Sequence, residues 1–197
     1  SGGRCHCGES ACEIYAASEP LARELNGHYM DQFTYAERAT DWRGNNNIAD
    51  SIFRQMCHEP NPVPAWVVMS AGTGGTSATI GRYIRCQGYE TQLMVADPEN
   101  SVFMDYWQHR DVNLRGSVGS KIEGIGRPRV EPSFIPDVVD SMLRVPDAAS
   151  VATAQWLETQ LGRKVGASTG TNMWGALQLA AQMRDEGKTG SIVTLLC

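Results

Sequence analysis

The chain has 197 residues, 42% of them hydrophobic, and a formal net charge of −5. This length holds one domain, or one domain and a fraction of another, and the hydrophobic content supports a real core. The acidic balance argues against a nucleic-acid surface, and no apolar run approaches the roughly 20 residues that span a membrane. The six cysteines lack the spacing of a disulfide framework, so we expect a cytoplasmic protein with no nucleic-acid and no membrane partner.

The N-terminal residues pose a choice between a metal site and buried thiols. Residues 3–9 are predicted to form a short strand and turn, and Cys5, His6, Cys7 and Cys12 lie close together in the sequence. Two cysteines one residue apart on a strand point to opposite faces, whereas structural zinc sites use C-x2-4-C spacing. Buried thiols are the better interpretation, and we predict no metal.

The segment up to residue 64 is predicted to alternate helix and loop. Residues 11–25 form a helix ended by an Asn-Gly pair, residues 28–33 an extended stretch, and residues 48–56 a helix capped by asparagines. The amide of Gln32 can both donate and accept hydrogen bonds. It suits a substrate carboxylate, and it equally suits an ordinary surface position. We expect His58, beyond the second helix, to be a surface residue.

The centre of the chain is a strand, a glycine turn and a helix, read from WVVMSAGTGGTSATIGRYIR over residues 66–85. A short apolar run bounded by glycine is typical of a strand covered on both faces. At the turn, free backbone N–H groups and the dipole of the following helix point at one spot, which favours an anion. The sequence therefore predicts a phosphate site, with hydroxyl donors from two threonines. Its residues are Gly72, Thr73, Gly74, Gly75 and Thr76.

Two common phosphate loops do not fit this turn. A P-loop needs a lysine after its last glycine, and none follows Gly75 or Gly81. The dinucleotide fingerprint G-x-G-x-x-G/A fails by one residue, because Ser77 occupies the sixth position. The alternative without a ligand, a tight turn between strand and helix, stays open on these residues alone.

Beyond residue 85 the pattern predicts strands at residues 92–96, 140–145 and 192–196, the last of them central. Between the first two, residues 104–119 are polar and aperiodic, which favours a surface insertion over a mobile flap. Asp147 can cap a helix that runs to Leu161 and that Gly162 ends.

A last helix is predicted before residue 192, after a loop that contains Ser168. Its apolar residues recur at i, i+3, i+4, i+7 and i+8, which makes them one face against a sheet. They are Met173, Ala176, Leu177, Ala180 and Ala181. Strands that alternate with helices predict an α/β fold with a doubly wound, mostly parallel sheet.

Four stretches in one order identify a family resemblance. They are Gln32-Phe33, the glycine turn of residues 72–76, Gly124-Ile125-Gly126, and Gly166-Ala167-Ser168-Thr169-Gly170. This order resembles the fold-type II pyridoxal-phosphate (PLP) enzymes, the cysteine synthase and cystathionine β-synthase family. Two segments are most similar in sequence to the branch of cysteine synthase-like proteins and L-cysteine desulfhydrases: EGIGRPRVEPSF and STGTN.

The resemblance implies a tryptophan synthase β-like fold, with residues 1–30 as the tail of a small domain and residues 31–197 as the large cofactor-binding domain. It implies PLP as cofactor, with its phosphate in the turn of residues 72–76 and its pyridine nitrogen at Ser168. A helix N-cap is the alternative role for this serine. The substrate side is implied to be Gln32, Gly124, Ile125 and Gly126.

The activity that the resemblance implies is β-elimination or β-replacement on cysteine- or serine-type amino acids, through an aminoacrylate intermediate. A neutral hydroxyl at the pyridine nitrogen gives a milder electron sink than a carboxylate and favours loss of a β-substituent. The implied partners are a small amino-acid substrate and a second copy in a homodimer. Cysteine synthesis and cysteine breakdown are not separated by the sequence.

The Schiff-base lysine is missing from the position where the family carries it, well before the phosphate turn. The only lysines are Lys121, Lys164 and Lys188, all interpreted as solvated charges. We therefore expect no catalytic residue in this chain, and expect the chain to be incomplete at both ends and inactive alone. The lysine is expected upstream, in the remainder of the polypeptide, or in a complementing chain. The alternatives are a non-catalytic fragment or regulatory binding module of the same fold, and a nucleotide-binding α/β domain.

Overall fold

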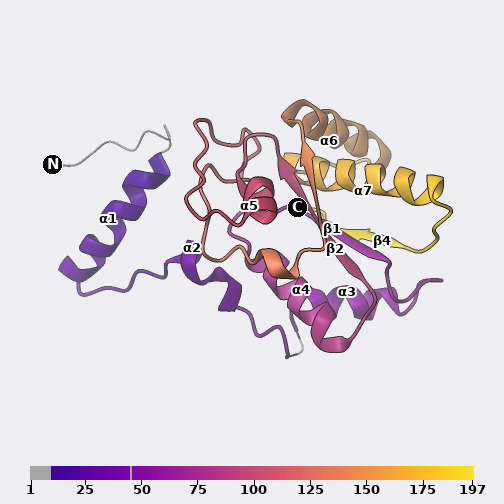
Figure 1. The fold of residues 1–197 in the computed structure, drawn as a ribbon, viewed down its shortest axis with the longest axis horizontal. Helices are drawn as coiled ribbons and strands as arrows, with labels where there is room; N and C mark the ends of the chain where they lie inside the picture. Colours follow the sequence, from indigo (N-terminus) through magenta and orange to yellow (C-terminus); the bar gives the residue numbers. More distant parts are fainter. Residues whose placement is uncertain (1–9, 45) are drawn as a thin grey trace.

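A computed structural model describes residues 10–44 and 46–197. The strand predicted over residues 3–9 and the cluster of Cys5, His6 and Cys7 lie outside the described residues, as does the side chain of Cys12. The described chain forms a four-stranded parallel sheet in the order β3-β2-β1-β4 (Figure 1). The strands are β1 (Trp66–Met69), β2 (Gln92–Pro98), β3 (Ser141–Val145) and β4 (Ile192–Thr194).

Helices cover both faces of this sheet, as the doubly wound pattern predicts (Figure 1). Successive residues of a strand point to opposite faces. Val67 and Met69 accordingly pack with α3 (Ile48–Met56) and α4 (Gly75–Gln87) on one side. Val68 packs on the other side against α7 (Ala167–Asp185), and α6 (Asp147–Leu161) lies against α7. Because both faces are buried, the strands are continuous apolar runs.

The segment before α3 differs from the prediction in one place. Helix α1 (Ser10–Glu24) lies to one side of the sheet (Figure 1) and is followed by Asn26 in the left-handed conformation. Residues 28–33 are not one extended stretch, because a short helix, α2 (Gln32–Tyr35), begins inside it. Asp31 adopts a left-handed conformation, and its carbonyl accepts hydrogen bonds from the N–H groups of residues 34 and 35. A 3-10 turn, η1 (Ala36–Arg38), continues α2.

Residues 104–119 also contain more regular structure than the sequence predicted. They begin within helix α5 (Phe103–His109). Phe103 is fully buried and stacks on Phe134 with ring centroids 4.3 Å apart. A carboxylate oxygen of Asp97 accepts the N–H of Met104, so contacts distant in sequence stabilise a helix that has no clear apolar period of its own. A second 3-10 turn, η2 (Pro136–Val138), precedes β3.

Three predictions about the C-terminal half were wrong in detail. Pro146, not Asp147, precedes α6 as its N-cap, and Asp147 is the first helical residue. The apolar face of α7 is set by Ala176, Leu179 and Met183, while Leu177 is 43% exposed. Among the described residues β4 is an edge strand, next to β1 alone, and not central.

The order of the strands places a crevice at one point of the sheet. From β1 the chain proceeds outward through β2 to β3 and then returns to the opposite side of β1, as β4. In open α/β sheets, ligands bind at the carboxyl ends of the strands where the winding reverses in this way. This point lies between β1 and β4.

No helix in the described ranges is long and apolar enough to cross a membrane.

Candidate functional site

The turn between β1 and α4 presents main-chain donors that no described residue accepts. β1 ends at Met69, and α4 begins at Gly75 with Gly74 as its N-cap. The first hydrogen bond of the helix runs from Ala78 N to Gly74 O, at 2.9 Å. Within residues 10–44 and 46–197, the N–H groups of residues 72–77 have no protein acceptor. Free N–H groups at the positive end of a helix dipole form a site for an anion.

Glycine is required in this turn because neighbouring main chain approaches it closely. A Cβ atom on Gly72 would lie 2.2 Å from the carbonyl oxygen of Gly124. A Cβ on Gly74 would lie 2.5 Å from the Cα of Phe134, and Gly74 also has a φ of +91° that favours glycine. The loops around residues 124 and 134 therefore hold the turn in place by main-chain contact.

Gln32 and the turn line the same pocket. This pocket has a volume of about 420 Å³ and is lined by Gln32 from α2 together with Thr73, Gly75 and Thr76. The side chain of Gln32 is exposed, as is Thr76. The hydroxyls of Thr73 and Thr76 make no hydrogen bond to any residue that the structure describes, so they are available to a ligand. The remaining lining residues are Ala36, Thr40, Asn46, Asn47, Ile48 and Thr79.

The loop Gly124–Gly126 lies directly beside the turn. The N–H of Gly126 donates to the carbonyl of Ala71 at 2.8 Å, and Gly124 abuts Gly72 as described above. Gly124 and Gly126 have φ values of +82° and +69°. A Cβ on Gly124 would meet no atom within 4 Å, so its outer face is open. The structure thus brings together three of the four predicted stretches.

Ser168 lies in the first turn of α7 at the same carboxyl edge of the sheet. Gly166 is the N-cap of α7, so Ser168 is not its cap, and the segment expected as a serine loop is already helical. The N–H of Gly166 donates to Cys197 O, just beyond β4, at 3.0 Å. The half-buried hydroxyl of Ser168 makes no hydrogen bond within the described part of the chain. It does not line the pocket that contains Gln32.

Sequence reasoning missed Ser133, which joins two parts of the site. Its N–H donates to Phe33 O at 3.1 Å, and its hydroxyl donates to Thr73 O. It also missed Arg127, Arg129 and Glu131, where the buried Glu131 carboxylate pairs with both guanidinium groups. The alternating charges in RPRVE could have indicated an ion-pair cluster, but nothing local says that its glutamate is fully buried.

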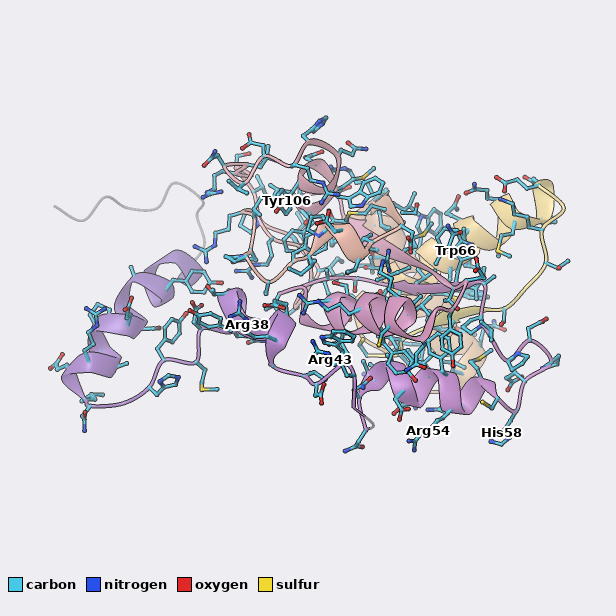
Figure 2. All side chains as sticks on the ribbon, turned by 60° about the horizontal axis from the view of Figure 1, so that its bottom comes forward. Arg38, Arg43, Arg54, His58, Trp66 and Tyr106 are labelled. Carbon is cyan, nitrogen blue, oxygen red and sulfur yellow. The ribbon has the colours of Figure 1, made fainter. Side chains whose placement is uncertain are left out.

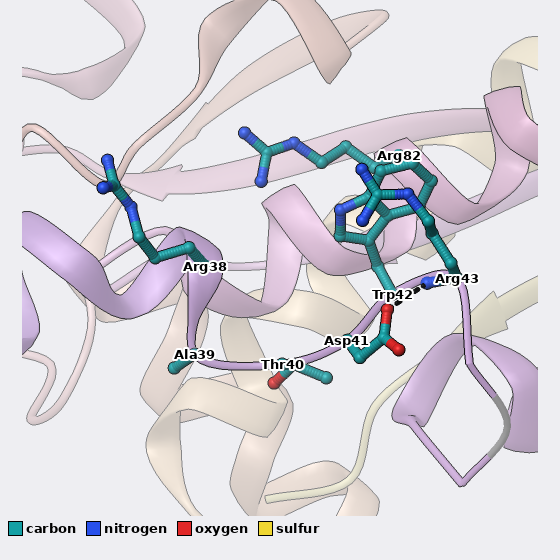
Figure 3. Close-up of a pocket in the computed structure, with 7 residues that line it drawn as sticks. All are labelled: Arg38, Ala39, Thr40, Asp41, Trp42, Arg43 and Arg82. Carbon is teal, nitrogen blue, oxygen red and sulfur yellow. Dashed lines mark hydrogen bonds between the residues drawn. The ribbon is translucent and has the colours of Figure 1, made fainter.

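A larger pocket of about 720 Å³ lies beside the first and is rich in arginine (Figure 3). Arg38 and Arg82 both donate to Glu37, with Arg82 at 2.5 Å, and Arg43 lies over the ring of Trp42. Burial opposes ionisation of Glu37, but the two arginines together hold the pKa of its carboxyl below the ordinary value. Two of the three cations are thus already paired, and we place the candidate site at the glycine turn instead.

Figure 2 shows Arg38 and Arg43 on the segment that leads into α3, and His58 at the surface beyond that helix.

None of the three lysines lines the pocket at the turn. Lys121, Lys164 and Lys188 are exposed, and Lys188 pairs with Glu186. No group of three or more histidine, cysteine or carboxylate side chains that could hold a metal occurs in the described ranges.

The residues present fit the phosphate end of PLP. The turn offers unpaired N–H groups, two free hydroxyls and glycine main chain that a ligand can approach closely, which are the features of an anion cradle. Ser168 supplies an unpaired hydroxyl at the same edge of the sheet.

Comparison with known proteins shows the family of the chain. The family model described as pyridoxal-phosphate dependent enzyme matches residues 5–197. L-cysteine desulfhydrase Cds1 of Mycobacterium tuberculosis is 58% identical over 99% of the chain and 53% of its own length. Cysteine synthase 2 of Schizosaccharomyces pombe is 30% identical over 87% of the chain and 44% of its own length. Cystathionine beta-synthase of Rattus norvegicus is 27% identical over 81% of the chain. The chain spans about half the length of the first two.

Proposed function

Since the chain belongs to the family of pyridoxal-phosphate-dependent enzymes, we propose that it forms the phosphate-binding and substrate-facing part of an enzyme of cysteine metabolism. The proposed reaction is β-elimination or β-replacement on a cysteine- or serine-type amino acid. The identity of 58% to a protein named L-cysteine desulfhydrase supports elimination from cysteine as the leading activity.

One observation carries the proposal: Thr73, Gly75 and Thr76, from a turn whose N–H groups have no acceptor among the described residues, line one pocket together with Gln32. A phosphate held by the turn and a carboxylate held by an amide define the two ends of a PLP–amino-acid pair. The nearby open face of Gly124 leaves room for the substrate beside the cofactor.

Each residue then has a defined task. Gly72 to Thr76 bind the phosphate by main-chain N–H groups and hydroxyls. Gln32 donates its amide N–H to the substrate carboxylate, and Gly124–Gly126 close the substrate side. The Ser168 hydroxyl binds the pyridine nitrogen. PLP, when bound, supplies the electron sink that lets the Cα–H bond break.

In elimination from cysteine, the Cα proton passes to a base and the Cβ–S bond breaks. Sulfur leaves with the bonding electron pair as hydrosulfide, and the remaining 2-aminoacrylate hydrolyses to pyruvate and ammonium. We propose that the base is a lysine supplied from outside these 197 residues, by the remainder of the polypeptide or by a complementing chain, because none of the three lysines lines the pocket. We further propose that the enzyme works as a homodimer in the cytoplasm.

The test measures cofactor binding and sulfide release separately. Calorimetric titration of the 197-residue chain with pyridoxal 5'-phosphate and with pyridoxal should show binding that depends on the phosphate. Sulfide and pyruvate should form from L-cysteine in equal amounts once a lysine-bearing segment is supplied. Phosphate-dependent binding without sulfide release in the complemented protein would support the second candidate, a non-catalytic binding module. Equal affinity for both ligands would contradict the proposal.

A further inference from the structure

Five side chains form one compact group between α1, α2 and the loop Gly124–Gly126, here called the substrate loop. We call this group the Glu131 cluster: Tyr15, Phe33, Arg127, Arg129 and Glu131. At its centre the carboxylate of Glu131 is 0% exposed. It accepts a hydrogen bond from Arg127 Nε at 3.1 Å, and from Arg129 Nε at 3.1 Å and Nη2 at 3.3 Å. A buried carboxylate needs such paired donors to remain ionised inside a protein.

Two aromatic rings complete the cluster. The Arg127 guanidinium lies 4.6 Å from the ring centroid of Phe33 and donates to Tyr15 Oη at 2.5 Å. The Arg129 guanidinium lies 4.0 Å from the ring centroid of Tyr15. The two rings meet edge to face at 4.6 Å. Burial, followed by the charge of Glu131, raises the pKa of the Tyr15 phenol, so this hydroxyl stays protonated. The planar guanidinium of Arg127 thus bonds in its plane and stacks on its face at once, which lysine cannot do.

The cluster connects the two segments that face the substrate. Arg127 directly follows Gly126, and its N–H donates to Ser101 Oγ at 3.2 Å while its carbonyl accepts from Val102 at 2.9 Å. The main chain of the substrate loop is therefore fixed at its exit. Phe33 directly follows Gln32, so the contact of Arg127 with the Phe33 ring links the chain next to Gln32 to the chain next to the Gly124–Gly126 loop.

We propose that Arg127 is a positioning residue for the amino-acid part of the substrate, acting through Phe33 and Glu131. This inference rests on the proposed function and adds a division within the site. Phosphate affinity is set by the main chain of the turn, whereas affinity for the substrate carboxylate depends on a side-chain cluster whose members do not line the pocket of Gln32 and the turn.

The test compares two ligands that differ only in the amino-acid part. Pyridoxine 5'-phosphate carries the ring and phosphate, and N-(5'-phosphopyridoxyl)-L-alanine carries the amino acid in addition. Dissociation constants for both are measured calorimetrically on the 197-residue chain. In the unaltered chain the alanine adduct should bind more tightly. The dissociation constant for pyridoxine 5'-phosphate divided by that for the alanine adduct therefore reports the contribution of the substrate side.

Arg127→Met should lower this ratio at least tenfold and leave the constant for pyridoxine 5'-phosphate within threefold. Arg127→Lys keeps a cation beside Glu131, so it tests the role even if Arg127→Met does not fold. It should still lower the ratio at least threefold. Arg43→Met is the matched control, because Arg43 also lies over an aromatic ring, Trp42 at 4.3 Å, but outside the cluster. It should leave the ratio unchanged.

Each other result is decisive. An unchanged ratio in both Arg127 variants, or an equal loss of affinity for both ligands in these variants, would overturn the positioning role. Phosphate binding by the unaltered chain would still stand as a function. An alanine adduct that binds the unaltered chain no more tightly than pyridoxine 5'-phosphate would also overturn it. Failure of the unaltered chain to bind either ligand would instead reject the proposed function, and the positioning role with it.

Discussion

The proposed phosphate side and the proposed substrate side of the site are built in different ways. The phosphate side is one continuous strand, turn and helix, and its donors are main-chain N–H groups of residues 72–77. The substrate side joins α2, the Gly124–Gly126 loop and α1 through side chains, with the buried Glu131 at the centre. Main-chain donors depend on backbone conformation, whereas a side-chain cluster depends on charge balance. The two sides should therefore fail under different substitutions.

The largest expected effect is on the phosphate side, from Gly74→Ala. The new Cβ would meet Phe134 Cα at 2.5 Å and Ser133 O at 2.7 Å, and the residue has a φ of +91°. We expect about 4 kcal/mol less stability from the clash and the backbone strain together. Gly88→Ala is the control, with a φ of +67° and no atom within 4 Å of its Cβ, and should lose about 1 kcal/mol. Urea denaturation followed by circular dichroism measures both. Equal losses would show that the turn has room for a side chain.

The next effect is on the substrate side, from Glu131→Gln. The neutral amide cannot balance two arginines in a buried place, so we expect a loss of about 3 kcal/mol. The control is Glu19→Gln, whose side chain is 62% exposed and pairs with Arg23 one helical turn away. It should change stability by less than about 0.5 kcal/mol. Thermal denaturation compares the two variants. A Glu131 variant as stable as the Glu19 variant would mean that the cluster does not depend on charge.

The smallest of the three effects concerns Asp97, near the carboxyl end of β2. Burial raises the pKa of this fully buried carboxyl to about 6, from 3.8. Between pH 4 and 6 the folded chain therefore holds a proton that the unfolded chain releases, and stability falls as the pH rises through this window. Asp97→Asn keeps the acceptor for the N–H of Met104 and should raise stability at pH 7 by about 2 kcal/mol. It should also flatten the fall between pH 4 and 6. A pH profile identical to that of the unaltered chain would contradict the assignment.

Local signals predicted the strand, the turn and the helix of the proposed phosphate side because the causes of these elements are local. The apolar run at residues 66–69, the glycines after it and the helix that follows are adjacent in sequence, and β1 has the predicted bounds. The asparagine cap of α3 was also found, since Asn47 accepts the N–H of Asp50 three residues later. The parallel, doubly wound sheet followed from the alternation of strands and helices.

The substrate side was predicted only as motifs, because its structure depends on contacts between distant residues. Arg127 and Tyr15 are 112 positions apart, and no period or spacing connects them. Gln32 begins a helix because the carbonyl of Asp31 accepts the N–H groups of residues 34 and 35. No pattern in the sequence predicts this turn. Helix α5 depends in the same way on Asp97 and on the stacking of Phe103 with Phe134.

Amide NMR shows whether the main-chain N–H groups of residues 72–77 bind the phosphate of PLP, as we propose. The 197-residue chain, labelled with nitrogen-15, is titrated with pyridoxine 5'-phosphate and, separately, with pyridoxine. We expect the largest shifts on the amides of residues 72–77, following one dissociation constant and occurring only with the phosphorylated ligand. Unchanged amide signals for residues 72–77 at saturating ligand would contradict it.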